Sequence, residues 1–167
     1  MRVALYQPDI PQNTGTILRM AACLGVAVDV IGPAGFDMSD RALRRAGLDY
    51  LDQVVMERHV SFAAFENSRR ERGARLLLLT TAGALPYPEF RYVDGDILLA
   101  GRESAGVPPE VHDAADARLK VPMSIGLRSL NVAVALAMVL GEALRQTGHF
   151  ERPRIIANSG LPGVGEE

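Results

Sequence analysis

The chain has 167 residues, of which 48% are hydrophobic and 23% charged, and its formal net charge is −2 at pH 7. These values are typical of a soluble domain with a sizeable core, and the charge does not by itself indicate a nucleic-acid partner. A single cysteine, Cys23, excludes an internal disulfide and favours a reducing compartment, and we expect its thiol to be buried. The N-terminus has no apolar signal segment, so we expect a cytoplasmic protein.

Strand and helix signals alternate through the first half of the chain. Strands are expected at 2–7 and 26–31, and helices at 13–24, 39–46 and 61–72. Asn13 and Ser61 open two of these helices as polar residues, and Gly25 stands where the first one should stop. Residues 50–56 fit a strand and a loop equally well, so they stay unassigned.

Short apolar runs in the second half predict strands at 75–80, 96–100 and 119–121. The first run contains four consecutive leucines, a pattern typical of a parallel-sheet strand that is covered on both faces. Strands that alternate with helices indicate an α/β domain, with a mostly parallel sheet flanked by helices, over residues 1–150. Residues 151–167 are rich in proline and glycine, and we expect them to form a disordered tail.

The longest predicted helix begins at Ser129, a good N-cap, and ends at Gln146 before Thr147 and Gly148. It is apolar nearly all round from residue 132 to residue 140, which predicts burial on several sides. This run is far shorter than the ~20 residues that cross a bilayer, so we expect no membrane span.

Arginine supplies nearly all of the positive charge, because Lys120 is the only lysine. Two clusters stand out, Arg41/Arg44/Arg45 and Arg69/Arg70/Arg72/Arg75. Each cluster fits a solvated helix face, and each also fits a surface that binds phosphate through planar, bidentate contacts. No carboxylates or thiols at ligand spacing accompany the three histidines, so we predict no metal site.

In an open α/β sheet, ligands bind outside the carboxyl ends of the strands. Three loops follow predicted strands there, at 79–83, 101–106 and 121–128, and all contain glycine or proline. None is a Walker loop, a dinucleotide fingerprint or a Gly-x-Ser-x-Gly elbow. Composition and spacing alone therefore lead only to an α/β ligand-binding protein.

Three segments, in order along the chain, resemble the three motifs of the SPOUT superfamily of trefoil-knotted RNA methyltransferases. They are Asn13-Thr-Gly-Thr-Ile-Leu-Arg19, Leu99-Ala-Gly101-Arg-Glu103-Ser-Ala-Gly106, and Val121-Pro-Met123 followed by Arg128-Ser-Leu-Asn131-Val132. One such motif would be a weak signal, whereas three in order are highly specific. The resemblance implies a SPOUT fold with a deep C-terminal trefoil knot, although knots are close to absent among folds in general.

Further segments are similar to the compact single-domain members, of the TrmL or YibK type, that methylate the ribose of the tRNA wobble nucleotide. These segments are Leu5-Tyr6-Gln7-Pro8, Gly35-Phe36 and residues 44–50. The resemblance implies S-adenosylmethionine as cofactor, the anticodon stem-loop of tRNA as substrate, and a homodimer packed through the first and last helices. It leaves open whether cytidine or a modified uridine is preferred. The alternatives are a non-catalytic dimeric RNA-binding protein of the same fold and a 2′-O-methyltransferase for another RNA site.

Motif positions carry the family's site residues onto this sequence. The resemblance assigns cofactor contacts to Leu79, Gly101, Val121, Met123, Ser129 and Leu130. It assigns RNA contacts to Asn13, Arg44, Arg45, Arg128 and Asn131, and the catalytic position to Arg19. Backbone groups and aliphatic walls suit the flat adenine of the cofactor, so no charged side chain is required there.

Two roles stay open for Arg19, because a guanidinium with a pKa of about 12 or more is a poor base. We favour a clamp on the adjacent phosphate that orients the 2′-hydroxyl, with a strongly perturbed Arg19 base as the second possibility. Asn13 fits helix capping and RNA contact equally well. Ser129 is expected both to cap its helix and to line the cofactor pocket, and Glu103 to hold its loop by hydrogen bonds.

Two residues depart from the family pattern. Related proteins often carry proline where Arg102 stands and an aromatic residue where Gly141 stands. Arg102 therefore leaves a charge beside the expected cofactor loop, and Gly141 removes a bulky group from the expected dimer face.

Overall fold

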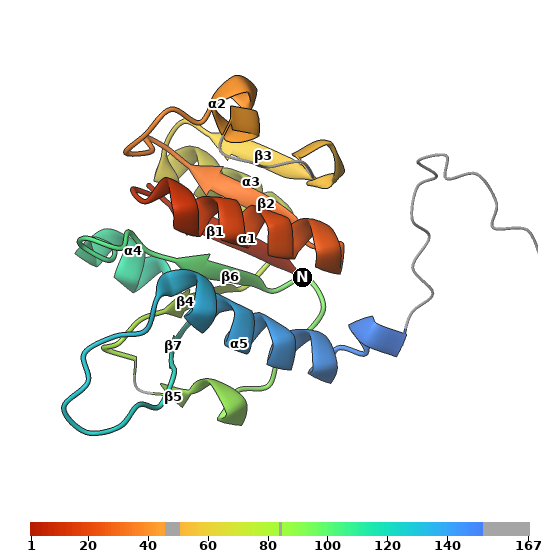
Figure 1. Ribbon diagram of the computed structural model, residues 1–167. Helices are drawn as coiled ribbons and strands as arrows, with labels where there is room; N and C mark the ends of the chain where they lie inside the picture. The colour runs from red at the N-terminus through yellow and green to blue at the C-terminus, as the bar shows by residue number, and fades with distance from the viewer. Residues whose placement is uncertain (46–50, 84, 152–167) are drawn as a thin grey trace, which may run out of the picture.

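The fold is an α/β arrangement built on one parallel sheet (Figure 1). The computed structural model describes residues 1–45, 51–83 and 85–151, and within them the strand order is β3-β2-β1-β6-β4-β7-β5. The strands are β1 (Arg2–Tyr6), β2 (Ala27–Ile31), β3 (Met56–His59), β4 (Leu76–Leu79), β5 (Leu85–Pro86), β6 (Ile97–Ala100) and β7 (Ala117–Lys120). The helices are α1 (Pro11–Leu24), α2 (Asp40–Arg45), α3 (Phe62–Glu71), α4 (Pro109–Ala114) and α5 (Val132–Gln146), with short 3₁₀ turns η1 (Leu51–Gln53), η2 (Tyr87–Glu89) and η3 (His149–Glu151). The predicted α/β class and parallel sheet are confirmed.

Helices cover both faces of the sheet. α1 and α5 lie side by side on one face (Figure 1), where Leu136 and the β6 residue Leu98 belong to one buried cluster. α3 and α4 cover the other face, where Phe65 and Val111 cluster with Leu99 of the same strand. Successive residues of a central strand thus enter opposite cores, which explains why these strands are apolar throughout.

Strand β7 is inserted between two strands that precede it in the sequence. It pairs with β4 on one side and with β5 on the other. The connection that leaves β4 crosses the end of β7 closely: a Cβ atom on Gly83 would lie 2.8 Å from the carbonyl carbon of Leu119, and the Thr80 N–H donates to the Leu119 carbonyl at 2.9 Å. The trefoil knot itself stays a prediction.

Helix α1 begins at Pro11, earlier than the sequence indicated. Proline suits the first helical position because its φ is already helical and its missing N–H needs no partner there. The N-cap is Ile10, and Asn13 lies within the helix, so the capping interpretation of Asn13 was wrong. The helix ends as predicted, with Gly25 at φ 64.

Helix α5 begins later than predicted, at Val132. Its N-cap is Asn131, whose side-chain oxygen accepts hydrogen bonds of 2.9 and 3.3 Å from the backbone N–H groups of Ala133 and Val134. The prediction that Ser129 caps this helix was therefore wrong. Asparagine and serine are both good caps, and the chain folds so that the second of the two is used.

Other expectations from the sequence also fail. Strand β3 was not predicted, because its Glu57 and Arg58 interrupt the apolar pattern of an edge strand. Helix α4 occupies residues to which the sequence analysis assigned no element. Cys23 is exposed on α1 rather than buried.

Among the described residues, helix α5 is covered on one side only. Leu136, Val139 and Leu140 are fully buried, whereas Val134 is 50% and Met138 is 41% exposed. The prediction of burial on several sides is therefore wrong for the single chain.

Within the described ranges, every helix is too short or too polar to span a membrane. The predicted tail lies outside the described residues, except for Glu151 at the end of η3.

A buried ion network lies on the α3 side of the sheet. Asp29 on β2 is fully buried and accepts hydrogen bonds from Arg2 at 2.7 and 2.9 Å, and one of its oxygens lies 2.9 Å from Nε2 of His59. Burial alone would raise the pKa of Asp29, but the bonds with Arg2 and His59 outweigh it and lower that pKa. Asp29, Glu57 and His59 each place one atom that could ligate a metal within 4.8 Å of the others. The interpretation that no carboxylates accompany the histidines was therefore wrong for His59. Arg2 and Arg72 balance these carboxylates.

Carboxylates also pair with the second arginine cluster. The pairs are Arg69 and Arg70 with Glu66, Arg72 with Glu57, and Arg75 with Asp96. Guanidiniums engaged in this way have less capacity for phosphate. The geometry therefore favours the solvated helix face over the phosphate-binding surface for this cluster.

Candidate active site

The carboxyl ends of β4, β6 and β7 open into a pocket of about 490 Å³. This volume lies within the range of small-molecule sites, and the three loops expected to bind a ligand all contribute to it. Asn13 and Asn131 line the pocket, as do the six residues that the resemblance assigns to the cofactor: Leu79, Gly101, Val121, Met123, Ser129 and Leu130.

Other residues assigned to the site lie elsewhere in the single chain. Arg19 and Arg128 are exposed and are not among the residues that line the pocket. Arg44 and Arg45 belong to α2, which lies near the β3 edge of the sheet (Figure 1), and their side chains lie outside the part that the structure describes. The pocket thus brings together the predicted cofactor residues but not Arg19 or Arg128.

A tight backbone loop forms one wall of the pocket after β6. Arg102 and Gly106 exchange two backbone hydrogen bonds, of 3.0 and 2.8 Å, which close this loop. Gly101 packs against it so closely that a Cβ atom would lie 2.8 Å from the carbonyl carbon of Gly106. Only glycine fits at position 101 without a shift of the backbone.

Side-chain amides join the three motif segments into one hydrogen-bond chain. Asn131 donates to Oδ1 of Asn13 at 2.8 Å, and Asn13 donates to Oε1 of Glu103 at 3.1 Å. The side-chain oxygen of Asn131 accepts from backbone N–H groups at the N-terminus of α5. The side-chain amides of Asn13 and Asn131 therefore each have a defined orientation. Segments far apart in the sequence therefore form a single polar wall.

Asp9 also binds the second motif segment, residues 99–106. Its carboxylate accepts hydrogen bonds from the backbone N–H of Glu103 at 3.1 Å and from the hydroxyl of Ser104. Bonds with Glu103 and Ser104 lower the pKa of Asp9, whereas burial and the neighbouring Asp9 raise the pKa of Glu103. Glu103 thus links the loop before α1 to the loop after β6, which is the role expected for it.

Arg102 adds a cation to the pocket wall. Its Nη1 lies 3.4 Å from Oε1 of Gln7, and its Nε lies 3.7 Å from Oδ2 of Asp9, beyond hydrogen-bond distance. This Nε atom is buried and has no hydrogen-bond partner among the described residues. Gln7 has φ 43, an uncommon value for a residue other than glycine. An under-bonded guanidinium therefore meets an unusual backbone at the end of β1.

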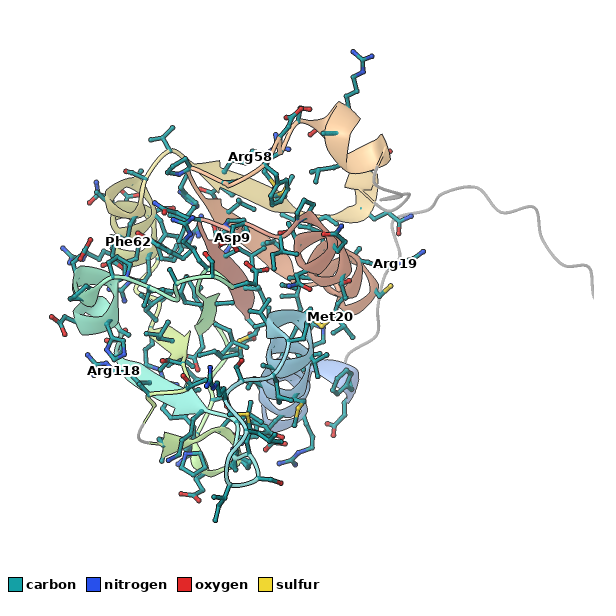
Figure 2. All side chains as sticks on the ribbon, turned by 60° about the vertical axis from the view of Figure 1, so that its left-hand side comes forward. Asp9, Arg19, Met20, Arg58, Phe62 and Arg118 are labelled. Carbon is teal, nitrogen blue, oxygen red and sulfur yellow. The ribbon has the colours of Figure 1, made fainter. Side chains whose placement is uncertain are left out.

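Arg19 lies on the exposed side of α1. It is six residues beyond Asn13, about 9 Å along the helix axis. Figure 2 shows Arg19 and Met20 on this helix, with Asp9 in the loop before it. Thr16 and Cys23, one turn before and after Arg19, are also exposed. Arg19 therefore does not complete the pocket of its own chain.

Exposed apolar side chains adjoin the pocket on the loop before α5 and on the helix itself. They include Ile125 and Leu127 in the loop and Val134 and Met138 on the helix. A Cβ atom added at Gly141 would meet nothing within 4 Å, so the helix surface is open there too. Exposed apolar side chains that gather on one part of a surface are a feature of interaction sites. We refer to these five residues as the α5 surface.

Sequence reasoning missed Asp9 and Ile10, which lie beside the second motif. Both stand between Pro8 and Pro11, in the loop that follows the carboxyl end of β1. A carboxylate in that position was a usable signal, since ligands bind at this edge of a parallel sheet. Its partner, 94 residues away, was not readable from local sequence.

Comparison with known proteins places these features in a family. The model of the SpoU rRNA Methylase family matches residues 1–141. A relative from Beijerinckia indica subsp. indica, named tRNA (cytidine(34)-2'-O)-methyltransferase, is 63% identical over 146 residues, which cover 87% of this chain and 91% of the relative. A protein of the same name from Escherichia coli K12 is 40% identical over 151 residues, which cover 89% of this chain and 95% of that protein.

Solved structures show the same likeness. One, described as "Structural insights into the 2-OH methylation of C/U34 on tRNA", is 46% identical with a TM-score of 0.81, over 87% of this chain and 94% of the other. The SpoU methyltransferase AviRb from Streptomyces viridochromogenes, in complex with the cofactor AdoMet, is 28% identical with a TM-score of 0.75, over 87% of this chain and 60% of the other.

Proposed function

The chain belongs to the SpoU methylase family, and from that membership we propose that it methylates the ribose 2′-hydroxyl of the tRNA wobble nucleotide, with S-adenosylmethionine as methyl donor. The observation that carries the proposal is the single pocket in which the three motif segments meet. Relatives at 63% and 40% identity bear the name of this activity, and a similar structure concerns C/U34 of tRNA.

The pocket fits this cofactor in the chemistry of its walls. Leu79, Val121 and Leu130 supply aliphatic surface, and Gly101 allows backbone to approach a ligand closely. Ser129 adds a hydroxyl. When bound, S-adenosylmethionine supplies an electrophilic methyl group on a sulfonium. The protein's own task is then to align the acceptor ribose and to manage the proton of its hydroxyl.

Alignment is the first contribution of the residues, and it can supply roughly 7–11 kcal/mol of a bimolecular barrier. The hydrogen-bond chain through Glu103, Asn13 and Asn131 holds polar groups rigidly at the pocket wall, where a ribose can be oriented. The 2′-hydroxyl must also lose its proton, and a base positioned to accept that proton would be worth a further ~10²–10⁴-fold. Arg19 clamps the phosphate next to the reacting ribose and orients its hydroxyl, and a base function for Arg19 is the second possibility.

A homodimer brings Arg19 to a pocket, because the residue cannot serve the pocket of its own chain. The α5 surface and the exposed side of α1 supply the contact between two copies. The apolar exposure of Val134 and Met138 supports this arrangement, since such a patch is covered in most soluble proteins. Each active site then combines one chain's pocket with the partner's α1.

The anticodon stem-loop binds across this dimer. Arg44 and Arg45 on α2 and Arg128 before α5 contribute phosphate contacts, and a dimer gathers two copies of each into one phosphate-binding surface although each chain carries a net charge of −2. The single cysteine and the tRNA substrate support a cytoplasmic location.

Labelled S-adenosylmethionine and unmodified tRNA test the function directly. Label on the ribose of the wobble nucleotide, mapped by nuclease digestion, is the expected result. The control is Arg91→Gln, which removes a positive charge from an exposed position outside the pocket. Label at another nucleotide would assign the enzyme to a different RNA site. Cofactor binding without any label on RNA would favour the non-catalytic RNA-binding protein.

A further inference from the structure

We propose that Arg102 forms a binding site for a phosphate group of the RNA substrate, beside the cofactor pocket, and thereby helps determine which RNA is accepted. The inference rests on the proposed function, because it places the anion on the same RNA.

The first argument is an unsatisfied donor. Nε of Arg102 is buried and has no hydrogen-bond partner among the described residues, although buried polar groups in proteins almost always have one. A charged donor without a partner is costly, so its retention needs a reason. The same side chain is 38% exposed, which leaves its outer nitrogens open to a ligand that enters from solvent.

The second argument is that the nearest acceptors are already engaged or too far away. Both oxygens of Asp9 are used, one by the Glu103 N–H and the other by the Ser104 hydroxyl, and Nε of Arg102 stays at 3.7 Å. Gln7 accepts from Arg102 only at the long distance of 3.4 Å. The protein therefore holds the guanidinium near Asp9 without satisfying it.

The third argument is rigidity. The backbone N–H of Arg102 donates to Gly106 at 3.0 Å, and Gly101 packs tightly against Gly106, so the base of the side chain has a fixed position. A guanidinium held in this way presents a planar set of donors, the geometry that binds phosphate oxygens in pairs. Lysine in the same position would offer only a point charge.

The position of Arg102 favours a phosphate of the RNA over the carboxylate of the cofactor. Its side-chain contacts run to Gln7 and Asp9, in the segment between β1 and α1. That segment leads into Asn13, which is assigned to the RNA. Five of the six residues assigned to the cofactor come instead from the end of β4 and from the loop after β7, and Gly101 alone comes from the loop that carries Arg102. A guanidinium on this side of the pocket meets the substrate backbone.

Binding of an anticodon stem-loop and of S-adenosylhomocysteine to Arg102→Gln, Arg102→Lys and Arg91→Gln tests the proposal. Arg91 is exposed and its carbonyl accepts from Arg75 at the amino end of β4, so Arg91→Gln removes the same charge away from the pocket. We expect Arg102→Gln to weaken RNA binding about tenfold and to reduce the slope of log K against log salt by about 0.7–0.9, the value for one phosphate contact. Arg102→Lys should recover part of the affinity.

Two further readings complete the test. Affinity for S-adenosylhomocysteine should stay within about twofold of wild type in all three variants, and the melting temperature of Arg102→Gln should not fall, because the side chain it removes is under-bonded. Equal RNA affinities for Arg102→Gln and Arg91→Gln would overturn the proposal. A loss of S-adenosylhomocysteine affinity in Arg102→Gln would instead assign the guanidinium to the cofactor carboxylate and overturn it as well.

Failure of this inference is distinguishable from failure of the proposed function. If the wild-type protein neither binds nor labels the anticodon stem-loop, the proposed function is wrong and the Arg102 site falls with it. If the wild-type protein does both and Arg102→Gln behaves like Arg91→Gln, only the Arg102 site is wrong.

Discussion

Asn131 donates a hydrogen bond of 2.8 Å to Asn13, across 118 residues of sequence. The same Asn131 side chain caps α5, and Asn13 lies in the first turn of α1. The two helices that cover one face of the sheet are therefore joined at their N-termini, at the wall of the pocket. The N-cap of α5, the contact between α1 and α5, and the geometry of the pocket wall therefore all depend on the side-chain amide of Asn131.

Replacement of Asn131 by alanine should destabilise the protein by about 0.5–2 kcal/mol, because α5 loses its N-cap. Chemical denaturation measures this change. The matched control is Ser129→Ala, which removes the polar side chain that the sequence indicated as the cap but that the structure does not use. Equal destabilisation by the two substitutions would contradict the assignment of Asn131 as the cap.

Arg19→Ala should lower turnover at least ~10²-fold, while the affinity for S-adenosylmethionine stays close to wild type, because we assign Arg19 to an RNA phosphate and not to the cofactor. Steady-state kinetics and calorimetry measure the two quantities. If the site is shared, mixing Arg19→Ala with a variant that has a defective pocket should restore about a quarter of the wild-type sites in a symmetric dimer. No recovery on mixing would argue that Arg19 acts within its own chain.

Gly101→Ala should weaken cofactor binding about ten- to hundredfold, because the added Cβ would lie 2.8 Å from the Gly106 backbone and overpacking of this kind costs ~1–3 kcal/mol. It is the pocket-defective variant for the mixing experiment. Gly141→Ala adds the same methyl group on the α5 surface, where nothing in the described part of the same chain lies within 4 Å and which does not line the pocket, so its cofactor affinity should equal that of wild type. Calorimetric titration with S-adenosylhomocysteine compares the two, and unchanged binding by Gly101→Ala would show that the loop tolerates the shift.

Asp29→Asn should destabilise the fold by roughly 3–5 kcal/mol, because it leaves the part-buried Arg2 without its carboxylate. The native pKa of Asp29 lies below the unfolded value of about 3.9, so the ionised carboxylate stabilises the fold above that pH. This contribution is lost as the pH falls through the native pKa, and the variant should lack that loss.

Asp40→Asn is the control for this experiment, because its ion pair with Arg58 is exposed on both sides and should contribute no more than ~1 kcal/mol. Urea denaturation at several pH values compares the two variants. A similar small effect of both substitutions would mean that the buried network adds little to stability.

Local patterns in the sequence were enough for the class of the fold and for the place of the site. The run Leu76–Leu79 predicts a strand covered on both faces, and the glycines at positions 101 and 106 indicate a tight loop. Each of these signals depends on only a few neighbouring residues. The order of the three motif segments, together with the rule for parallel sheets, led to the pocket at the carboxyl ends of the strands.

Tertiary contacts decided the rest. Asn131 and Ser129 are both acceptable caps, and the contact of Asn131 with Asn13 is the kind of interaction that no window of sequence contains. Strand β3 pairs with β2 although Glu57 and Arg58 make it partly polar, and Asp9 meets its partner Glu103 across 94 residues. Sequence determined what each segment tends to form within a few residues, because propensity is local. Which side chains meet, and that Arg19 faces away from its own pocket, was decided only by the packing of distant segments.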